Sequence, residues 1–234
     1  MSSKLRPGGA IGRRPLHFIW IADCSGSMDG DKIRSLNHAI REAIPHMRDT
    51  AEENPFAEVK VRAIKFSTDA TWHIATPTPV ESFQWVDLDV EGLTSLGKAL
   101  ELAAEVLDVG NMGARALPPV LVLISDGQPT DNFKGGLDTL MKQPWGKKAV
   151  RIAIAIGADA DRDVLQEFIG HSEYHPLEAN NPEALVRMIR FVSTSVLKSA
   201  SSPPSHRVDD DSPVVGNVPI PKPPEGDIDE EDVW

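Results

Sequence analysis

Two periodicities alternate along the first 200 residues of the chain. Runs dominated by apolar and β-branched residues predict buried strands, and apolar residues at steps of three and four predict helices. The expected strands are 16–22, 59–66, 71–75, 119–125, 149–156 and a weak edge strand at 174–177. The expected helices are 31–47, 95–107, 133–141, 162–169 and 182–197. Alternating strands and helices predict an α/β fold with a mostly parallel sheet that carries helices on both faces.

Polar residues, glycine and proline place the ends of these elements. Asp29 or Asp31 is expected to cap the first helix, whose last turn Pro45 weakens. The polar link 67–70 predicts a hairpin, and the proline-rich stretch 76–79 should end its second strand. Residues 111–114 are expected to form a loop.

Composition limits the classes of protein that the chain could represent. Its 234 residues, 41% of them hydrophobic, suffice for one α/β domain with an appendage. No apolar run is long enough for a membrane span, and residues 1–14, expected as a flexible leader, lack the apolar core of a secretory signal. Cys24 is the single cysteine, which favours a reducing, cytoplasmic location. The net charge of −11 argues against nucleic acid as a partner, and no membrane contact is expected.

The last segment, 200–234, has a different composition. From 201 on it contains nine acids, two bases and seven of the 19 prolines, which predicts disorder. Its end, 227–234, combines acids with Ile228, Val233 and Trp234, and an aromatic anchor of this kind suits a short motif that docks a partner protein. A solubilising linker, or a tail carboxylate that occupies the chain's own metal site, remain the alternatives.

Three loops contain the side chains with distinctive chemistry. Asp23, Ser25 and Ser27 lie where the first strand gives way to a helix, Thr94 lies in a glycine-flanked loop, and Asp126 ends the fourth strand. Carboxylates and hydroxyls are hard oxygen ligands, which suit Mg²⁺ or Mn²⁺. Turn and capping roles alone are the competing interpretation of these five residues.

Asp-x-Ser-x-Ser, a later Thr and a strand that ends in Ser-Asp-Gly resemble, in this order, the metal-ion-dependent adhesion site of von Willebrand factor A (vWA) domains. The resemblance covers most of the chain, and we expect the domain at 15–199. It implies a doubly wound, six-stranded sheet of order 3-2-1-4-5-6 with one antiparallel edge strand. It also implies that Ser25, Ser27 and Thr94 offer hydroxyls to the cation and that Asp23 and Asp126 bind it directly or through water. A partner protein would then supply a carboxylate as a further ligand.

A narrower resemblance is to TerY-like bacterial proteins of tellurite resistance and stress response. It is carried by Arg13-Arg-Pro-Leu16, Asp23-Cys-Ser-Gly-Ser-Met-Asp-Gly30 and Ser125-Asp-Gly-Gln-Pro-Thr-Asp131. It implies a non-enzymatic, metal-dependent protein-binding module, a cytoplasmic scaffold or regulator that works with a PP2C-type phosphatase and a Ser/Thr kinase. The alternative is a magnesium-dependent phosphohydrolase, although Ser25 stands where that class needs a second acid. A dinucleotide-binding domain is discarded, because the first loop has too few glycines.

Four further features have two interpretations each. Asp131 suits a helix cap better than a metal ligand. The thiol of Cys24 is expected to be buried and inert rather than reactive. His171 and His175 are expected to be exposed rather than zinc ligands. Phe83 and Trp85 either cover the core or form part of a partner surface.

Overall fold

The computed structural model describes residues 12–126, 128–202, 214–215 and 218–224. The order of the helices and strands in these residues is β1 (Arg14–Asp23), η1 (Gly26–Met28), α1 (Asp31–Glu52), β2 (Ala57–Phe66), β3 (Ala70–Pro79), α2 (Leu96–Ala104), α3 (Val109–Met112), β4 (Val120–Ser125), α4 (Phe133–Lys142), β5 (Val150–Ile156), α5 (Arg162–Ile169), β6 (Leu177–Ala179), α6 (Pro182–Phe191), η2 (Val192–Val196), α7 (Leu197–Ser201), β7 (Val214–Val215) and β8 (Val218–Pro219).

The main sheet has the order β3-β2-β1-β4-β5-β6, which confirms the predicted topology. β1 pairs in parallel with both β2 and β4, and the antiparallel strand is β3 at one edge. β4 and β5 are buried along their whole length, as expected for strands covered on both faces. The chain therefore reverses its direction of winding between β1 and β4, where loops from two neighbouring strands open outward.

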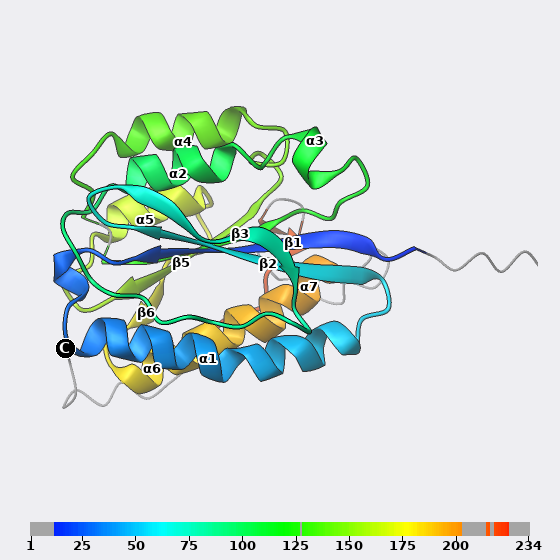
Figure 1. Cartoon of the computed structure of the whole chain (residues 1–234), viewed down its shortest axis with the longest axis horizontal. Coiled ribbons are helices and arrows are strands. Elements are labelled where there is room, and N and C mark those ends of the chain that lie inside the picture. Colours follow the sequence, from blue (N-terminus) through cyan, green and yellow to red (C-terminus); the bar gives the residue numbers. More distant parts are fainter. Residues whose placement is uncertain (1–11, 127, 203–213, 216–217, 225–234) are drawn as a thin grey trace, which may run out of the picture.

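Helices cover both faces of this sheet (Figure 1). α1 and α6 pack against each other on one face, with α7 beside them, and α2 packs against α4 on the other face, where α5 contacts β5. α1 continues through Pro45 to Glu52, because its apolar stripe continues beyond the proline with the buried Met47 and Ala51. Its N-cap is Gly30 and has no side-chain capping bond, so the predicted cap at Asp29 or Asp31 is wrong.

Two local predictions fail at sequence features that usually end regular structure. β3 runs through 76–79 to Pro79 instead of ending before it. Proline is tolerated there because an edge strand leaves part of its N–H groups unpaired. The expected loop at 111–114 begins inside the short helix α3, which Asp108 caps by accepting from the Asn111 N–H at 2.9 Å.

The end of the domain also extends further than predicted. The last helix passes through the π-helical turn η2 and continues as α7 to Ser201. Beyond it, β7 and β8 form an antiparallel pair, and Val218 and Ile220 are fully buried in the core. The prediction of disorder from 200 onward is therefore wrong for Val218 and Ile220, whose side chains pack in a core that composition alone does not reveal. Residues 227–234 lie outside the described residues.

A buried basic pair lies within the sheet. His17 on β1 is 4% exposed, and Arg62 on β2 is also buried, with its guanidinium carbon 5.5 Å from the ring centre of Trp72 on β3. Burial, followed by the charges of Arg62 and Lys60, lowers the pKa of His17 to about 4. The unfolded chain therefore binds a proton at His17 more readily than the folded chain does, and the stability that a neutral His17 contributes is lost as the pH falls from about 6.5 to 4.

Replacing His17 with leucine should remove this dependence. The free energy of unfolding of the parent should fall, relative to His17→Leu, by up to about 3 kcal/mol between pH 6.5 and pH 4. Urea denaturation at a series of pH values measures this difference. His38→Leu on the exposed side of α1 is the matched control and should follow the parent. Parallel curves for the parent and His17→Leu would contradict the role of His17.

Candidate metal centre

Three loops meet at the carboxyl ends of the central strands, at the end of the sheet where η1 follows β1 (Figure 1). Asp23 is the last residue of β1, and Asp126 directly follows β4. The two strands are paired in register, Ala22 with Ile124, which brings their ends together. The sheet itself therefore places the two carboxylates predicted from the sequence next to each other.

The first loop folds back on its own carboxylate. The N–H of Ser25 donates to Asp23 Oδ1 at 2.8 Å, and the hydroxyl oxygens of Ser25 and Ser27 lie 3.0 Å apart. The 3-10 turn η1 fixes this arrangement, with the Met28 N–H donating to the Ser25 carbonyl at 2.9 Å. Ser25 is buried and Ser27 is exposed, so the serine pair connects the buried carboxylate with the surface.

The two carboxylates are buried without a basic partner. Asp23 is 0% exposed and Asp126 is 1% exposed, and neither forms an ion pair within the part of the chain that the structure describes. Burial raises the pKa of Asp23 to about 6, an effect opposed by hydrogen bonds from Ser125 and Ser25 and reinforced by the charge of Asp126. Buried carboxylates of this kind normally require compensation by positive charge.

Thr94 belongs to a second loop that is bonded to the other two. The loop contacts the first through the Glu91 N–H, which donates to the Cys24 carbonyl at 2.8 Å, and through the Gly92 carbonyl, which accepts from the Gly26 N–H at 3.0 Å. It contacts the third through Thr130, whose N–H donates to the Thr94 carbonyl at 2.8 Å. Thr94 is itself buried. All five predicted residues therefore lie on three loops that hydrogen bonds connect.

The turn between β2 and β3 supports this second loop, a role that the sequence analysis missed. Thr68 accepts from the Leu93 N–H through its hydroxyl at 3.2 Å and from the Ser95 hydroxyl through its carbonyl at 2.8 Å. Gly92 has φ +69, and a Cβ there would come within 1.9 Å of the Thr68 hydroxyl oxygen. A glycine is required at this position for both reasons, and the glycine-flanked Thr94 was the only signal of it in the sequence.

Ser125 was also missed as a contributor to the site. Its hydroxyl donates to Asp23 Oδ2 at 2.5 Å, so both oxygens of Asp23 accept a hydrogen bond from the chain. A charge-assisted bond of this kind holds the carboxylate in one orientation. The contact could not be read from the sequence, because the two residues are 102 positions apart and meet only through the β1–β4 pairing.

Asp131 acts as a helix cap, but of a helix other than its neighbour in sequence. Its two carboxylate oxygens accept from the Gly97 N–H at 2.8 Å and the Lys98 N–H at 2.9 Å, at the start of α2. The following helix, α4, is capped by Asn132. Asp131 thus fastens the third loop to the helix that begins two residues after Thr94, where a carboxylate also interacts favourably with the helix dipole.

The remaining sequence candidates have structural surroundings. Cys24 is 2% exposed, and burial, followed by the charge of Asp23, raises its pKa to about 12. Phe83 and Trp85 are buried, and Trp85 donates to Asn37 at 2.9 Å, so they cover the core. His175 is exposed, as predicted, and contacts Gln166, whereas His171 is partly buried.

The donor set fits a hard divalent cation. Among the described residues, no group of three or more histidine, cysteine, aspartate or glutamate side chains is placed to hold a metal ion. A cation at this site would therefore need hydroxyl ligands in addition to the two carboxylates, which is the preference of Mg²⁺ and Mn²⁺ rather than of zinc. The adjacent buried carboxylates provide the attraction for such an ion.

Fold and site together define a doubly wound α/β domain with a candidate cation site at its topological switch point. The sequence model of the von Willebrand factor type A domain matches residues 19–190, and the chain belongs to this family. A search of curated protein sequences finds no match.

Solved structures with the same fold are distant in sequence. They include the ArnB paralog VWA2 from Sulfolobus acidocaldarius (18% identity, TM-score 0.56), a von Willebrand factor type A protein from Catenulispora acidiphila (15%, 0.57) and the pilus adhesin SpaC from Lactobacillus rhamnosus GG (13%, 0.60). The alignments cover 75%, 80% and 80% of this chain but only 44%, 43% and 30% of those chains. This chain therefore spans less than half of each of these proteins, and identities this low establish the shared fold alone.

Removing the carboxylate of Asp131 should destabilise the protein, although Asp131 is not a proposed metal ligand. Asp131→Ala leaves two N–H groups of α2 without their acceptor, which should lower the free energy of unfolding by about 1–2 kcal/mol. Urea denaturation measures this loss. Asp138→Ala, which removes an exposed carboxylate from α4, is the control and should change stability little. Equal destabilisation by the two substitutions would show that the capping bonds do not stabilise the protein.

Proposed function

We propose that the chain is a protein-binding module whose contact with its partner passes through Mg²⁺ or Mn²⁺ at Asp23, Ser25, Ser27, Thr94 and Asp126. The observation that carries the proposal is the pair of adjacent buried carboxylates, which has no basic partner among the described residues. Membership in a family whose domains are often interaction modules supports it.

The side chains around the site have separate roles in this proposal. Asp23 and Asp126 supply the negative charge, and the hydroxyls of Ser25, Ser27 and Thr94 are neutral ligands. A bound cation would supply residual positive charge that attracts a carboxylate of the partner, because neutral hydroxyls do not cancel a divalent charge. Ser125 and the Ser25 N–H hold Asp23 in its orientation. The rigid loops thus present a nearly fixed site, which lowers the entropic cost of binding.

We further propose, from the sequence resemblance, that the protein acts as a TerY-like scaffold or regulator in the cytoplasm of a bacterium. Its partners would be a PP2C-type phosphatase and a Ser/Thr kinase, in a stress response such as tellurite resistance. No helix in the described part of the chain is long and apolar enough to cross a membrane.

A non-enzymatic role is the better proposal for this site. The alternative, a magnesium-dependent phosphohydrolase, would use Asp23 as the nucleophile with a second acid nearby to move a proton. The direct partners of Asp23 are instead the Ser25 N–H and the Ser125 hydroxyl, both of which donate to it. That class needs its second acid two residues after the nucleophile, and here Ser25 occupies this position.

Metal binding can be measured directly by calorimetry with MnCl₂ and MgCl₂. Asp23→Ala combined with Ser25→Ala should abolish the binding heat, because it removes one carboxylate and one hydroxyl. Circular dichroism should show the fold retained. Asp29→Ala is the matched control, since Asp29 lies in the same segment, is exposed and is not a proposed ligand. Unchanged affinity in the double variant would refute the assignment, and capture of partners that is insensitive to EDTA would refute metal-dependent contact.

The tail residues Ile228, Val233 and Trp234, which lie outside the described residues, are proposed as a second docking element. Deleting 228–234 should abolish capture of a partner while the affinity for Mn²⁺ stays unchanged. Tighter metal-dependent partner binding after the deletion would instead indicate that the tail occupies the site in the intact chain. If capture of every partner is unchanged, the tail is a linker.

A further inference from the structure

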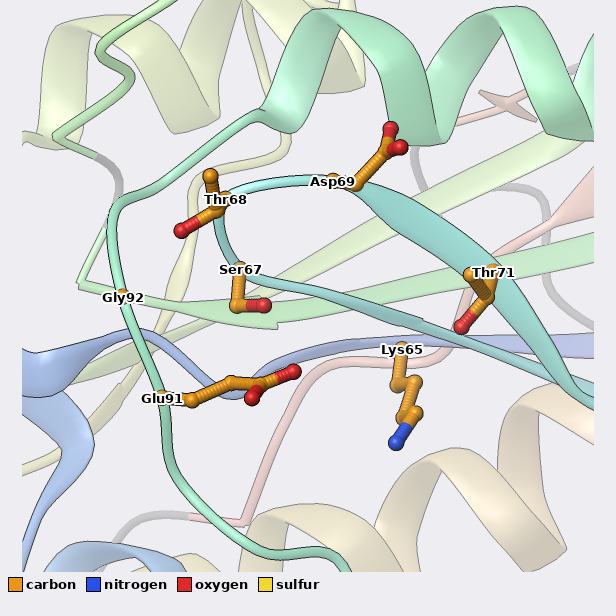
Figure 2. Close-up of a pocket in the computed structure, with 7 residues that line it drawn as sticks. All are labelled: Lys65, Ser67, Thr68, Asp69, Thr71, Glu91 and Gly92. Carbon is orange, nitrogen blue, oxygen red and sulfur yellow. The ribbon is translucent and has the colours of Figure 1, made fainter.

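A cavity of about 330 Å³, lined mostly by polar and charged residues, lies beside the candidate metal centre. Figure 2 shows the side chains that surround it, which come from the end of β2, the β2–β3 turn, the start of β3 and the loop that leads to Thr94. Its lining residues are Lys65, Ser67, Thr68, Asp69, Thr71, Glu91 and Gly92. None of them belongs to the ligand set proposed for the cation site.

The cavity contains one uncompensated charge of each sign. Asp69 is neutralised by Lys98, whose Nζ lies 3.3 Å from its carboxylate. Lys65 and Glu91 both line the cavity but form no ion pair within the described residues. In Figure 2 the side chain of Lys65 extends from β2, and that of Glu91 extends from the loop that leads to Thr94. Lys65 is partly buried, whereas Glu91 is exposed.

The wall of the cavity is also part of the metal centre. The backbones of Glu91 and Gly92 are bonded to Cys24 and Gly26, within the Asp-x-Ser-x-Ser segment. The next residue, Leu93, is 58% exposed, which makes it one of the few large apolar side chains on the described surface. A protein that reaches the metal site would therefore find Leu93 and the cavity within the same contact area.

We propose that the cavity binds a carboxamide side chain, asparagine or glutamine, of the partner that reaches the metal site. The identity of the partner rests on the proposed function, but the charge pattern does not. A carboxamide offers an acceptor to the ammonium of Lys65 and a donor to the carboxylate of Glu91. A second carboxylate would be repelled by Glu91, and a guanidinium or ammonium would be repelled by Lys65. An apolar side chain would leave both charges without a partner.

The test uses four small probes that differ only in their side chains. N-acetylated, α-amidated glutamine, glutamate, lysine and leucine are titrated into the ¹⁵N-labelled protein in EDTA. The glutamine probe should shift the amide signals of Thr68, Asp69 and Gly92 with the highest affinity, and the leucine probe with the lowest. Absence of shifts at these amides, or equal affinity for all four probes, would overturn the proposal.

Two charge variants then identify the residues responsible. Glu91→Gln leaves the positive charge of Lys65 unbalanced in the cavity. It should therefore raise the affinity for the glutamate probe, relative to the glutamine probe, about two- to fivefold. Lys65→Gln should produce the same change in favour of the lysine probe. Lys147→Gln, an exposed lysine that does not line the cavity, is the matched control and should keep the order of the parent. An order that neither cavity variant alters would also overturn the proposal.

The result is independent of the metal. Because EDTA is present throughout, failure of the cation site to bind Mn²⁺ would refute the proposed function and leave the probe titrations interpretable. Conversely, binding of Mn²⁺ at Asp23 and Ser25 without any preference among the probes would support the proposed function and refute the carboxamide site.

Discussion

The structure of this site depends on the burial of two adjacent carboxylates at the ends of β1 and β4. Two neighbouring buried charges of the same sign raise each other's energy, and neither has a basic partner among the described residues. Hydrogen bonds to Asp23 from Ser25 and Ser125 offset part of this cost. A divalent cation would compensate the remainder, so the electrostatics of the site and the proposed chemistry have the same origin.

Rigidity of the surrounding loops follows from their mutual hydrogen bonds rather than from helices or strands. The first loop is bonded to the Glu91–Gly92 segment, that segment is supported by Thr68, and Asp131 fastens the third loop to α2. Each bond joins residues that are far apart in sequence. A substitution in a supporting turn can thus affect the candidate cation site although it removes no proposed ligand, because the loops hold one another in position.

The shared fold does not by itself determine the partner, because one fold can carry many different functional sites. In this chain the features that could select a partner lie around the candidate cation site rather than in it. Leu93 is exposed next to Thr94, and the cavity with Lys65 and Glu91 adjoins the same loop. A cation attracts many carboxylates with little discrimination, so selectivity has to come from neighbouring contacts of this kind.

The sequence by itself determined the elements whose periodicity is strong. The apolar runs gave the central strands, and the order of the sheet followed from the family resemblance. Five oxygen-bearing residues were predicted as ligands because they lie where a strand ends or on a loop that leads to a helix. Its errors occurred at Asp29, Pro45, 76–79 and 111–114, where local preferences for caps, breaks and loops were overridden by packing.

Only the tertiary structure decided which distant residues support the site. Ser125 reaches Asp23 through strand pairing, Asp131 caps α2 rather than α4, and Val218 and Ile220 enter the core from a segment whose composition predicts disorder. The physical reason is that periodicity and composition report the preferences of neighbouring residues, whereas these contacts depend on how strands and loops far apart in the chain are brought together.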